Sequence, residues 1–199
     1  MNRLKETIVI LSFSFLGFSP EIYPSSASEY AALTHEKIQT VIQENDELFK
    51  EQPEQFTKLI AEAFSPIVDF KKISKSVMGK YQKTASKDQI EKFAKVFRES
   101  LLDKYSKTLV EFKDERIIVL PSRQNNQGRA VVEIEIHTST KIYPGKYSMY
   151  LDKNSKWKII NIMINGINLG LVFRNQFYSS MEKYNQDIDK VINSWISTI

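Results

Sequence analysis

Residues 157–181 constrain the fold most, because a strand, a turn and a helix follow one another there without a break. Residues 157–164 are apolar on both alternating faces, which is typical of a strand covered on both sides. Asn165 and Gly166 provide a turn, and Asn168 is a suitable N-cap for the next helix. The apolar residues of that helix return at three- and four-residue steps: Leu169, Val172, Phe173, Phe177 and Met181. We therefore expect a helix attached directly to the last long strand of a sheet.

The chain before the sheet is predicted to be helical. Apolar stripes in residues 28–85 indicate several short helices, one of which begins at Pro53 and is interrupted at Ser65 and Pro66. Ser86 and Gln89 have the spacing of a capping box and open the longest helix. The stripe of this helix consists of Ile90, Phe93, Phe97, Leu101, Tyr105 and Leu109. We expect a sheet or a ligand to cover so much apolar surface.

Four strands are predicted to follow, at residues 116–120, 129–138, 146–151 and 157–164. Short connections favour an antiparallel meander, with residues 124–128 as a polar loop and residues 143–145 as a turn. A closing helix places Ile188, Val191, Ile192 and Trp195 on one face. The predicted class is α+β: a helical part at 28–85, then a long helix, the sheet and two helices at 86–199.

Composition limits what this chain can do. Its 199 residues are enough for one domain with a core, and its net charge of +4 is mild. No run of basic residues with interleaved aromatics suggests a nucleic-acid groove, so we expect no nucleic-acid partner. The absence of cysteine excludes disulfides, thiolate metal sites and a cysteine nucleophile.

The first 27 residues are typical of an export signal. Arg3 and Lys5 form a basic start, residues 7–18 form an apolar run, and residues 25–27 offer small side chains at a cleavage site. A run of 12 residues is shorter than the ~20 that a membrane span needs. We therefore expect the mature protein to begin near Ser28 and to be periplasmic.

The sequence offers little for catalysis. His35 and His137 are the only histidines, and structural or surface roles are favoured for both. Glu133 and Glu135 share one strand face and are more simply its wet side than a catalytic pair. Without a known catalytic motif, we expect no enzyme, metal or cofactor. Arg174 leaves two alternatives open: a surface or helix-packing contact, or a contact to a partner or a lipid phosphate.

Two motifs resemble one known family. Residues 157–170, WKIINIMINGINLG, followed by RNQF at 174–177, are similar to the pattern W-K-h-h-D-V-h-h-x-G-V-S/N-L and Y/F-R-x-Q-F of the MlaC family, the toluene-tolerance-type periplasmic phospholipid-binding proteins. Residues 69–86, DFKKISKSVMGKYQKTAS, match a second family pattern of D-F, basic residues, L/V-G-K-Y/W and a helix start. With the order of elements between them, the resemblance covers nearly the whole mature chain.

The resemblance implies a curved, nuclear-transport-factor-2-like sheet whose flanking helices enclose an apolar cavity for phospholipid acyl chains. It also implies docking to an inner-membrane ABC complex with an MCE-type ring protein and to an outer-membrane lipoprotein and porin complex, which would preserve outer-membrane lipid asymmetry. Under it, the candidate lining is Phe97, Leu101, Tyr105, Leu109, Val132, Ile134, Ile136, Met149, Leu151, Ile160, Ile162 and Ile164. By spacing alone, the same stripes are more often ordinary core.

Other functions stay open on the same fold. A carrier of another apolar lipid, such as a hopanoid, needs only an oily cavity and has the same pattern. A small periplasmic enzyme or a non-catalytic interaction protein is also compatible, because fold does not fix function. An enzyme would need polar groups converging in the cavity, and an interaction protein would have a filled core.

Overall fold

A computed structural model describes residues 26–111, 115–121, 123–125 and 127–195. The predicted export signal falls outside these ranges except for Ser26 and Ala27, so it stays a prediction. The helices are α1 Ala27–Glu44, α2 Asp46–Glu51, α3 Pro53–Phe64, α4 Phe70–Met78, the 3-10 helix η1 Gly79–Lys83, α5 Lys87–Glu111, α6 Leu169–Lys183 and α7 Ile188–Ser194. The strands are β1 Arg116–Val119, β2 Arg123–Asn125, β3 Arg129–His137, β4 Ile142–Leu151, β5 Trp157–Ile164 and β6 Ile167–Asn168.

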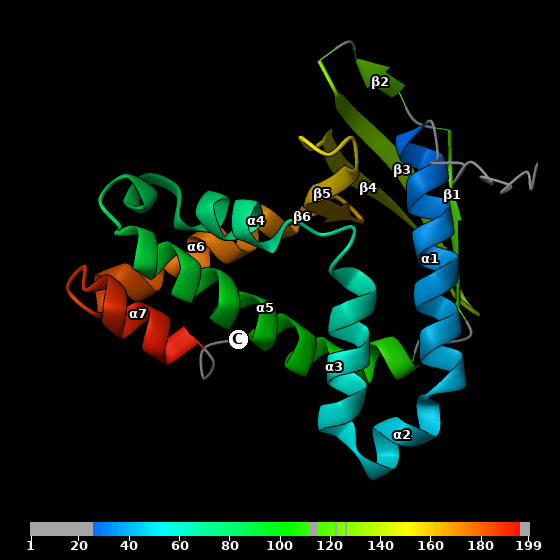
Figure 1. Cartoon of the computed structure of the whole chain (residues 1–199), viewed down its shortest axis with the longest axis horizontal. Helices are drawn as coiled ribbons and strands as arrows, with labels where there is room; N and C mark the ends of the chain where they lie inside the picture. Colours follow the sequence, from blue (N-terminus) through cyan, green and yellow to red (C-terminus); the bar gives the residue numbers. More distant parts are fainter. Residues whose placement is uncertain (1–25, 112–114, 122, 126, 196–199) are drawn as a thin grey trace, which may run out of the picture.

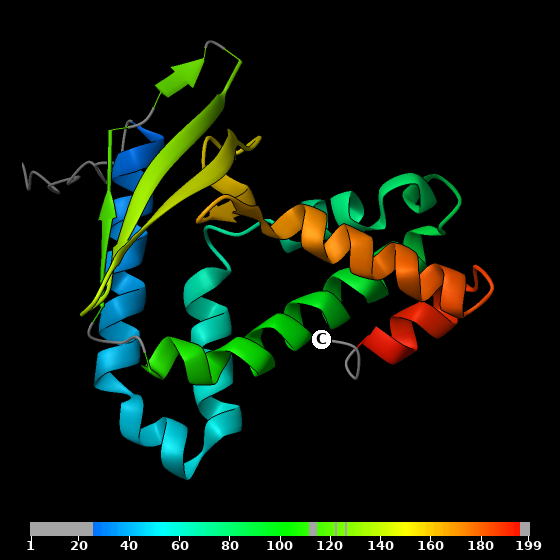
Figure 2. The ribbon, with the colours of Figure 1, turned by 180° about the vertical axis from the view of Figure 1, so that it is seen from behind.

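The molecule has two parts joined near the middle (Figure 1). In one part, α1 runs along the sheet; in the other, α4, α6 and α7 pack with the first half of α5. Helix α3 and the second half of α5 lie between the two parts, as the view from behind also shows (Figure 2). The predicted α+β class is therefore confirmed.

The sheet is antiparallel, with the strand order β1-β3-β4-β5-β6. The four predicted strands are present, but the prediction of four strands is wrong, because β2 and β6 bring the described sheet to six. Strand β2 pairs with the start of β3 in a segment predicted to be a loop, and β6 folds back on the end of β5. Both extra strands are two or three residues long. Such short pairings leave no alternating pattern that a sequence could display.

The turn predicted at residues 143–145 is also wrong, because β4 continues through it. Pro144 lies opposite Glu135 and Gly145 lies opposite Ile134 of β3. The N–H and C=O of one residue point to the same side of a strand, and the Pro144 carbonyl accepts a hydrogen bond from Asn165 N (2.7 Å), where β5 ends. The missing proline donor therefore faces the end of β5, so the ladder loses only one hydrogen bond, at its last pair. The hairpin turn lies instead after β3, where Thr138 N donates to Lys141 O (2.8 Å).

The predicted helix starts are confirmed by their caps. Ser86 and Gln89 form the reciprocal capping box, with Gln89 N donating to Ser86 Oγ (3.1 Å) and Ser86 N donating to Gln89 Oε1 (2.9 Å). Asn168 caps α6 by accepting from Leu171 N (3.2 Å). Ser26 caps α1, and Ala27 is fully buried, so both residues belong to the folded unit.

Helices, rather than the sheet or a ligand, cover the aromatic stripe of α5. Phe93 and Phe97 are fully buried, and their rings form edge contacts with Phe177, Phe173 and Trp195 of the C-terminal helices. For Phe93 and Phe97, the expectation that a sheet or a ligand covers the stripe is therefore wrong. Further along α5, Leu102 packs with residues of α1 and α3 in a separate cluster. Aromatic contacts between helices therefore bury the part of the stripe at Phe93 and Phe97 and leave no cavity beside it.

We predict that Gly79→Ala destabilises the protein by roughly 2–4 kcal/mol. Gly79 has φ +55°, and a Cβ there would collide with the Tyr178 hydroxyl, which accepts a hydrogen bond from Lys80 N (3.0 Å). Gly166→Ala is the matched control, since its φ of +79° is also positive but its Cβ would meet nothing within 4 Å. It should cost about 1 kcal/mol. Urea unfolding measures both losses, and equal losses would show that the Tyr178 contact imposes no constraint.

Candidate functional site

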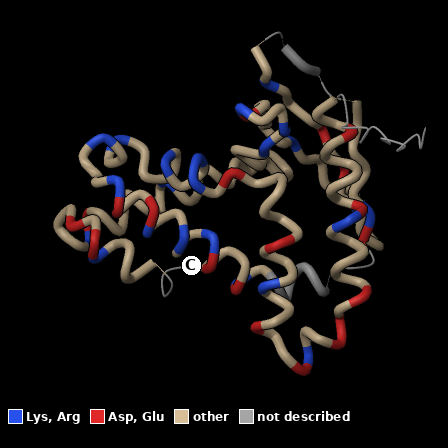
Figure 3. The backbone as a smooth tube through the Cα atoms, in the orientation of Figure 1, with Lys and Arg blue, Asp and Glu red and all other residues tan. Residues whose placement is uncertain are grey.

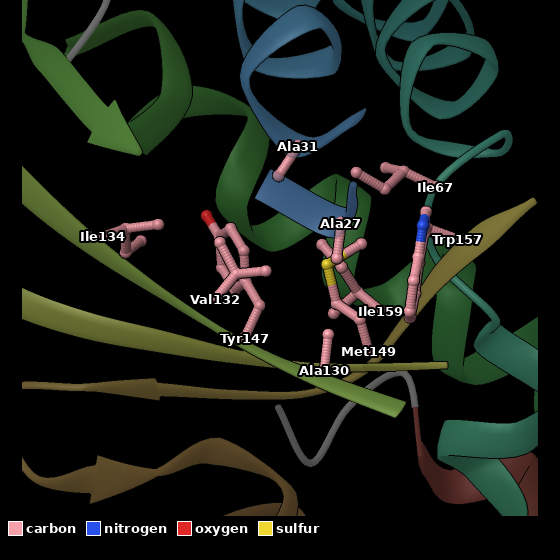
Figure 4. Packing of buried hydrophobic residues seen from close by; sticks show 10 residues of the cluster. All are labelled: Ala27, Ala31, Ile67, Ala130, Val132, Ile134, Tyr147, Met149, Trp157 and Ile159. Atoms are coloured by element: carbon pink, nitrogen blue, oxygen red, sulfur yellow. The ribbon is translucent and has the colours of Figure 1, made fainter. Parts of the chain in front are cut away.

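The inner face of the sheet carries the larger group of candidate residues. Val132, Ile134 and Met149 are at most 2% exposed and pack with residues of α1 and with Ile67 (Figure 4). Ile136 and Ile162 are partly buried against the same group. Their strands alternate as predicted, so these five candidates share one face. The whole group, named the sheet cluster here, consists of Ala27, Ala31, Ile67, Ala130, Val132, Ile134, Tyr147, Met149, Trp157 and Ile159.

The long-helix candidates lie elsewhere. Phe97 is fully buried, and Leu101 partly buried, in a second group formed with α4, α6 and α7 and named the aromatic helical cluster. This cluster consists of Val77, Met78, Phe93, Phe97, Phe173, Phe177, Met181, Val191, Ile192 and Trp195. The sequence prediction joined these residues to the sheet in one lining, and the structure instead separates the two groups. The physical reason is that residues 65–69 and α3 bring α1, rather than α5, onto the sheet (Figure 1).

Several other candidates do not belong to either group. Tyr105 is 42% exposed and Leu151, at the end of β4, is 39% exposed, so neither is enclosed. Ile164 is half-buried at the end of β5, and the side chain of Leu109 lies outside the described residues. Ile160 lines a cleft against α4. It takes this direction because the pairing of β4 with β5 shifts register between Ser148 and Met149, which leaves Ile160 without a partner.

A polar pair joins the inner face of the sheet to α1, with Tyr147 buried and His35 half-buried. Tyr147 and His35 of α1 stack with their ring centroids 5.5 Å apart, and the Tyr147 hydroxyl lies 2.8 Å from His35 Nε2. Burial raises the pKa of Tyr147 and lowers the pKa of His35 to about 4. The hydroxyl therefore donates and the neutral imidazole accepts. Pattern analysis missed this pair, although Ala31, His35, Ile38 and Ile42 stand at helical spacing and three of them are apolar.

A basic cleft of about 540 Å³ opens beside the sheet, between α4 and β5. Asp69 caps α4 by accepting from Lys72 N (2.9 Å), and it also accepts a hydrogen bond from the Tyr150 hydroxyl. Burial, reinforced by this bond, raises the pKa of Tyr150 to about 12. The Lys72 ammonium stands 3.4 Å above the Tyr150 ring, a cation–π contact. The lining consists of Asp69, Lys71, Lys72, Lys75, Ser76, Gln82 and Ile160.

The remaining polar candidates have structural contacts. Arg174 donates from Nε to Ser76 O (2.8 Å) and from a terminal nitrogen to Ser76 Oγ (3.0 Å), which is the helix-packing alternative. His137 Nε2 lies 2.7 Å from Glu135 Oε2. Within the described ranges, acidic and histidine side chains do not gather in groups able to hold a metal ion. No helix of the described chain is long and apolar enough to cross a bilayer.

Comparison with known proteins gives a consistent result. The sequence profile of the MlaC protein family matches residues 33–197. The toluene tolerance protein ttg2D of Pseudomonas putida is 32% identical over 157 residues, which cover 78% of this chain and 73% of that protein. The intermembrane phospholipid transport system binding protein MlaC of Haemophilus influenzae is 23% identical over 176 residues, which cover 84% of this chain and 81% of that protein.

A solved structure has the same fold. The phospholipid-binding protein from Ralstonia solanacearum, in complex with a phospholipid, superposes with a TM-score of 0.75 at 19% identity. The match covers 87% of this chain and 99% of that chain. At this identity the likeness establishes the fold, while the sequence matches establish the family.

We predict that acid destabilises this protein through His35. The unfolded histidine takes up its proton near pH 6.5, whereas the folded one does so only near pH 4, so the unfolded state binds more protons between these values. Stability that is present above pH 6.5 is therefore lost as the pH falls to 4, by about 3 kcal/mol. Urea unfolding from pH 7 to pH 4 should show a flatter dependence for His35→Gln. The same slope in the wild type and in His35→Gln would contradict the prediction.

Proposed function

Because this chain belongs to the MlaC family, we propose that it is a periplasmic phospholipid carrier that shuttles lipid between the inner and outer membranes. The observation that carries the proposal is the family match, which includes all strands of the sheet and the whole aromatic helical cluster. The names of the relatives support it: one is a phospholipid transport binding protein and another a toluene tolerance protein. The solved neighbour, which holds a phospholipid, supports the same cargo.

In the proposed complex, the acyl chains occupy an apolar cavity on the inner face of the sheet. Val132, Ile134, Ile136, Met149 and Ile162 are the lining residues, since they share that face. Phe97 and Leu101 act as core instead, because helices already cover them. The head group stays at the mouth of the cavity, in contact with water.

The energetics of acyl chains require docking for release. At about 0.8 kcal/mol per buried methylene, one chain of roughly 16 carbons favours the cavity over water by about 12 kcal/mol. Release into the aqueous periplasm is then negligibly slow. The carrier unloads only where the tails pass directly between two apolar cavities. The proposed docking partners are an inner-membrane ABC complex with an MCE-type ring protein and an outer-membrane lipoprotein and porin complex, in a cycle that maintains outer-membrane lipid asymmetry.

The first test is mass spectrometry of an organic extract of the mature protein, purified from a periplasm without detergent. We expect near-stoichiometric phospholipid, because spontaneous loss of two tails is slow. A stoichiometric hopanoid or other apolar lipid would replace phospholipid as the cargo. A folded protein without extractable lipid would contradict the proposal and favour an interaction protein.

We predict that Ile162→Glu abolishes lipid retention while the protein stays folded. Ile162 is partly buried against the sheet cluster, so a carboxylate there places a charge against the acyl chains. Ile142→Glu is the matched control, because Ile142 lies in the same sheet but is 57% exposed. Circular dichroism checks folding, and lipid per protein in the extract is the measurement. Lipid retained by folded Ile162→Glu removes Ile162 from the proposed lining.

A further inference from the structure

A second cleft, of about 490 Å³, lies where the two parts of the molecule meet, and it is lined by residues from the α3–α4 connection, α4, α5 and β5. Its apolar lining touches both hydrophobic groups, because Val68 packs on the sheet cluster and Phe70 on the aromatic helical cluster. The lining consists of Ser65, Val68, Asp69, Phe70, Lys71, Glu91, Ala94, Lys95, Arg98 and Lys158. Its polar part has four cations against two carboxylates.

Both carboxylates of this cleft already have partners. Glu91 pairs with the Lys71 ammonium, and Asp69 accepts from Lys72 N and from the Tyr150 hydroxyl. The Lys158 ammonium donates to the Pro66 carbonyl (2.6 Å), which uses one of its three hydrogens. The lining of the cleft therefore carries an excess of positive charge. Figure 3 shows basic residues on both α4 and the neighbouring α5.

The guanidinium of Arg98 carries the strongest signal. Its Nε is buried and has no hydrogen-bond partner among the described residues. A buried charged donor without an acceptor is rare in folded proteins, because it loses hydration and gains nothing in exchange. Arg98 lines the cleft, so an acceptor that enters the cleft stands beside its guanidinium.

We propose that this cleft binds a phosphate group. The cations come from three elements, with Lys71 on α4, Lys95 and Arg98 on α5, and Lys158 on β5. The oxygens of a tetrahedral phosphate point in several directions and can accept from donors that converge from different sides, whereas a carboxylate has only two oxygens in one plane. The apolar lining beside these cations suits a phosphate that carries acyl chains.

The phosphate has two possible sources, a phospholipid head group and free inorganic phosphate. The first source rests on the proposed carrier function, and there it assigns the head group to a definite set of cations. The second source does not depend on that function. A test must therefore vary the phosphate and the acyl chains separately.

The test compares the wild type with Arg98→Met and with Arg116→Met. The second variant removes the same charge from an exposed position on β1, away from the cleft. Each protein is first stripped of the phospholipid that it retains and refolded. Calorimetric titration then uses dihexanoyl phosphatidylglycerol and dihexanoylglycerol, which share their acyl chains but differ in the phosphate. A ³¹P NMR titration measures inorganic phosphate alone. If Arg98→Met does not fold, Lys95→Met takes its place, because Lys95 is exposed and its truncation leaves no cavity.

We expect Arg98→Met to lower the affinity for dihexanoyl phosphatidylglycerol about tenfold, because one charge-assisted hydrogen bond is lost. Dihexanoylglycerol should bind equally well to all three proteins, and Arg116→Met should bind the phospholipid like the wild type. If Arg98→Met loses affinity only for inorganic phosphate, the site exists and its ligand is free phosphate.

Equal affinities of wild type and Arg98→Met for every phosphate probe overturn the proposed site. If dihexanoylglycerol still binds in that case, the carrier function survives. If neither lipid binds the wild type, the carrier function fails, and the inorganic phosphate titration still decides whether the site exists.

Discussion

A parallel backbone bridge ties the connection between α3 and α4 to strand β5 of the sheet. Ile159 N in β5 donates to Ile67 O (2.7 Å), and Asp69 N donates to Ile159 O (3.1 Å), so Val68 forms a parallel bridge with Ile159. Each of these backbone groups would be costly to bury without a partner. Pairing satisfies them and fixes the chain direction between α3 and α4.

This bridge directs the neighbouring side chains into different clusters. Ile67 enters the sheet cluster, while Phe70 packs on the aromatic helical cluster. Asp69 lies between them, where it caps α4 and holds the Tyr150 hydroxyl of β4. The separation of two cores, and the basic clefts at their boundary, thus follow from the position of a few connecting residues. A substitution in this connection would therefore alter the packing on the sheet face and the lining of both clefts.

The features predicted correctly are those that a short stretch of chain determines. The capping box of Ser86 and the cap of Asn168 depend on residues three positions apart. Strands β3 and β4 follow from alternation, and β1 and β5 follow from short apolar runs. The covering of α5 was predicted wrongly, because any apolar partner satisfies an apolar stripe and tertiary packing selects it. Pro144 resembles a turn residue until β3 and β5 are in place on either side of it. The burial of His35 could have been predicted from its place in the apolar stripe of α1. Nothing in the sequence marks Arg98, since a nitrogen without a hydrogen-bond partner is a property of the folded environment.

The helices that cover the two cores differ in how much apolar area they bury. This difference indicates where a lipid can enter. The aromatic helical cluster interlocks Phe93, Phe97, Phe177 and Trp195, whose removal from one another would expose large apolar areas. Helix α1 covers the sheet cluster with only two fully buried residues, Ala27 and Ala31.

Alanine buries little area, so lifting the start of α1 from the sheet costs far less hydrophobic free energy than parting the aromatic helices. The polar cost of this movement is the loss of two hydrogen bonds, between Tyr147 and His35 and from the Tyr30 hydroxyl to the Pro66 carbonyl. If acyl chains reach the inner face of the sheet, the covering element that yields at the lowest cost is therefore α1. The His35 contact then sets how far along α1 such an opening extends, because beyond it Ile38 and Ile42 are held in a third cluster with α3 and Leu102.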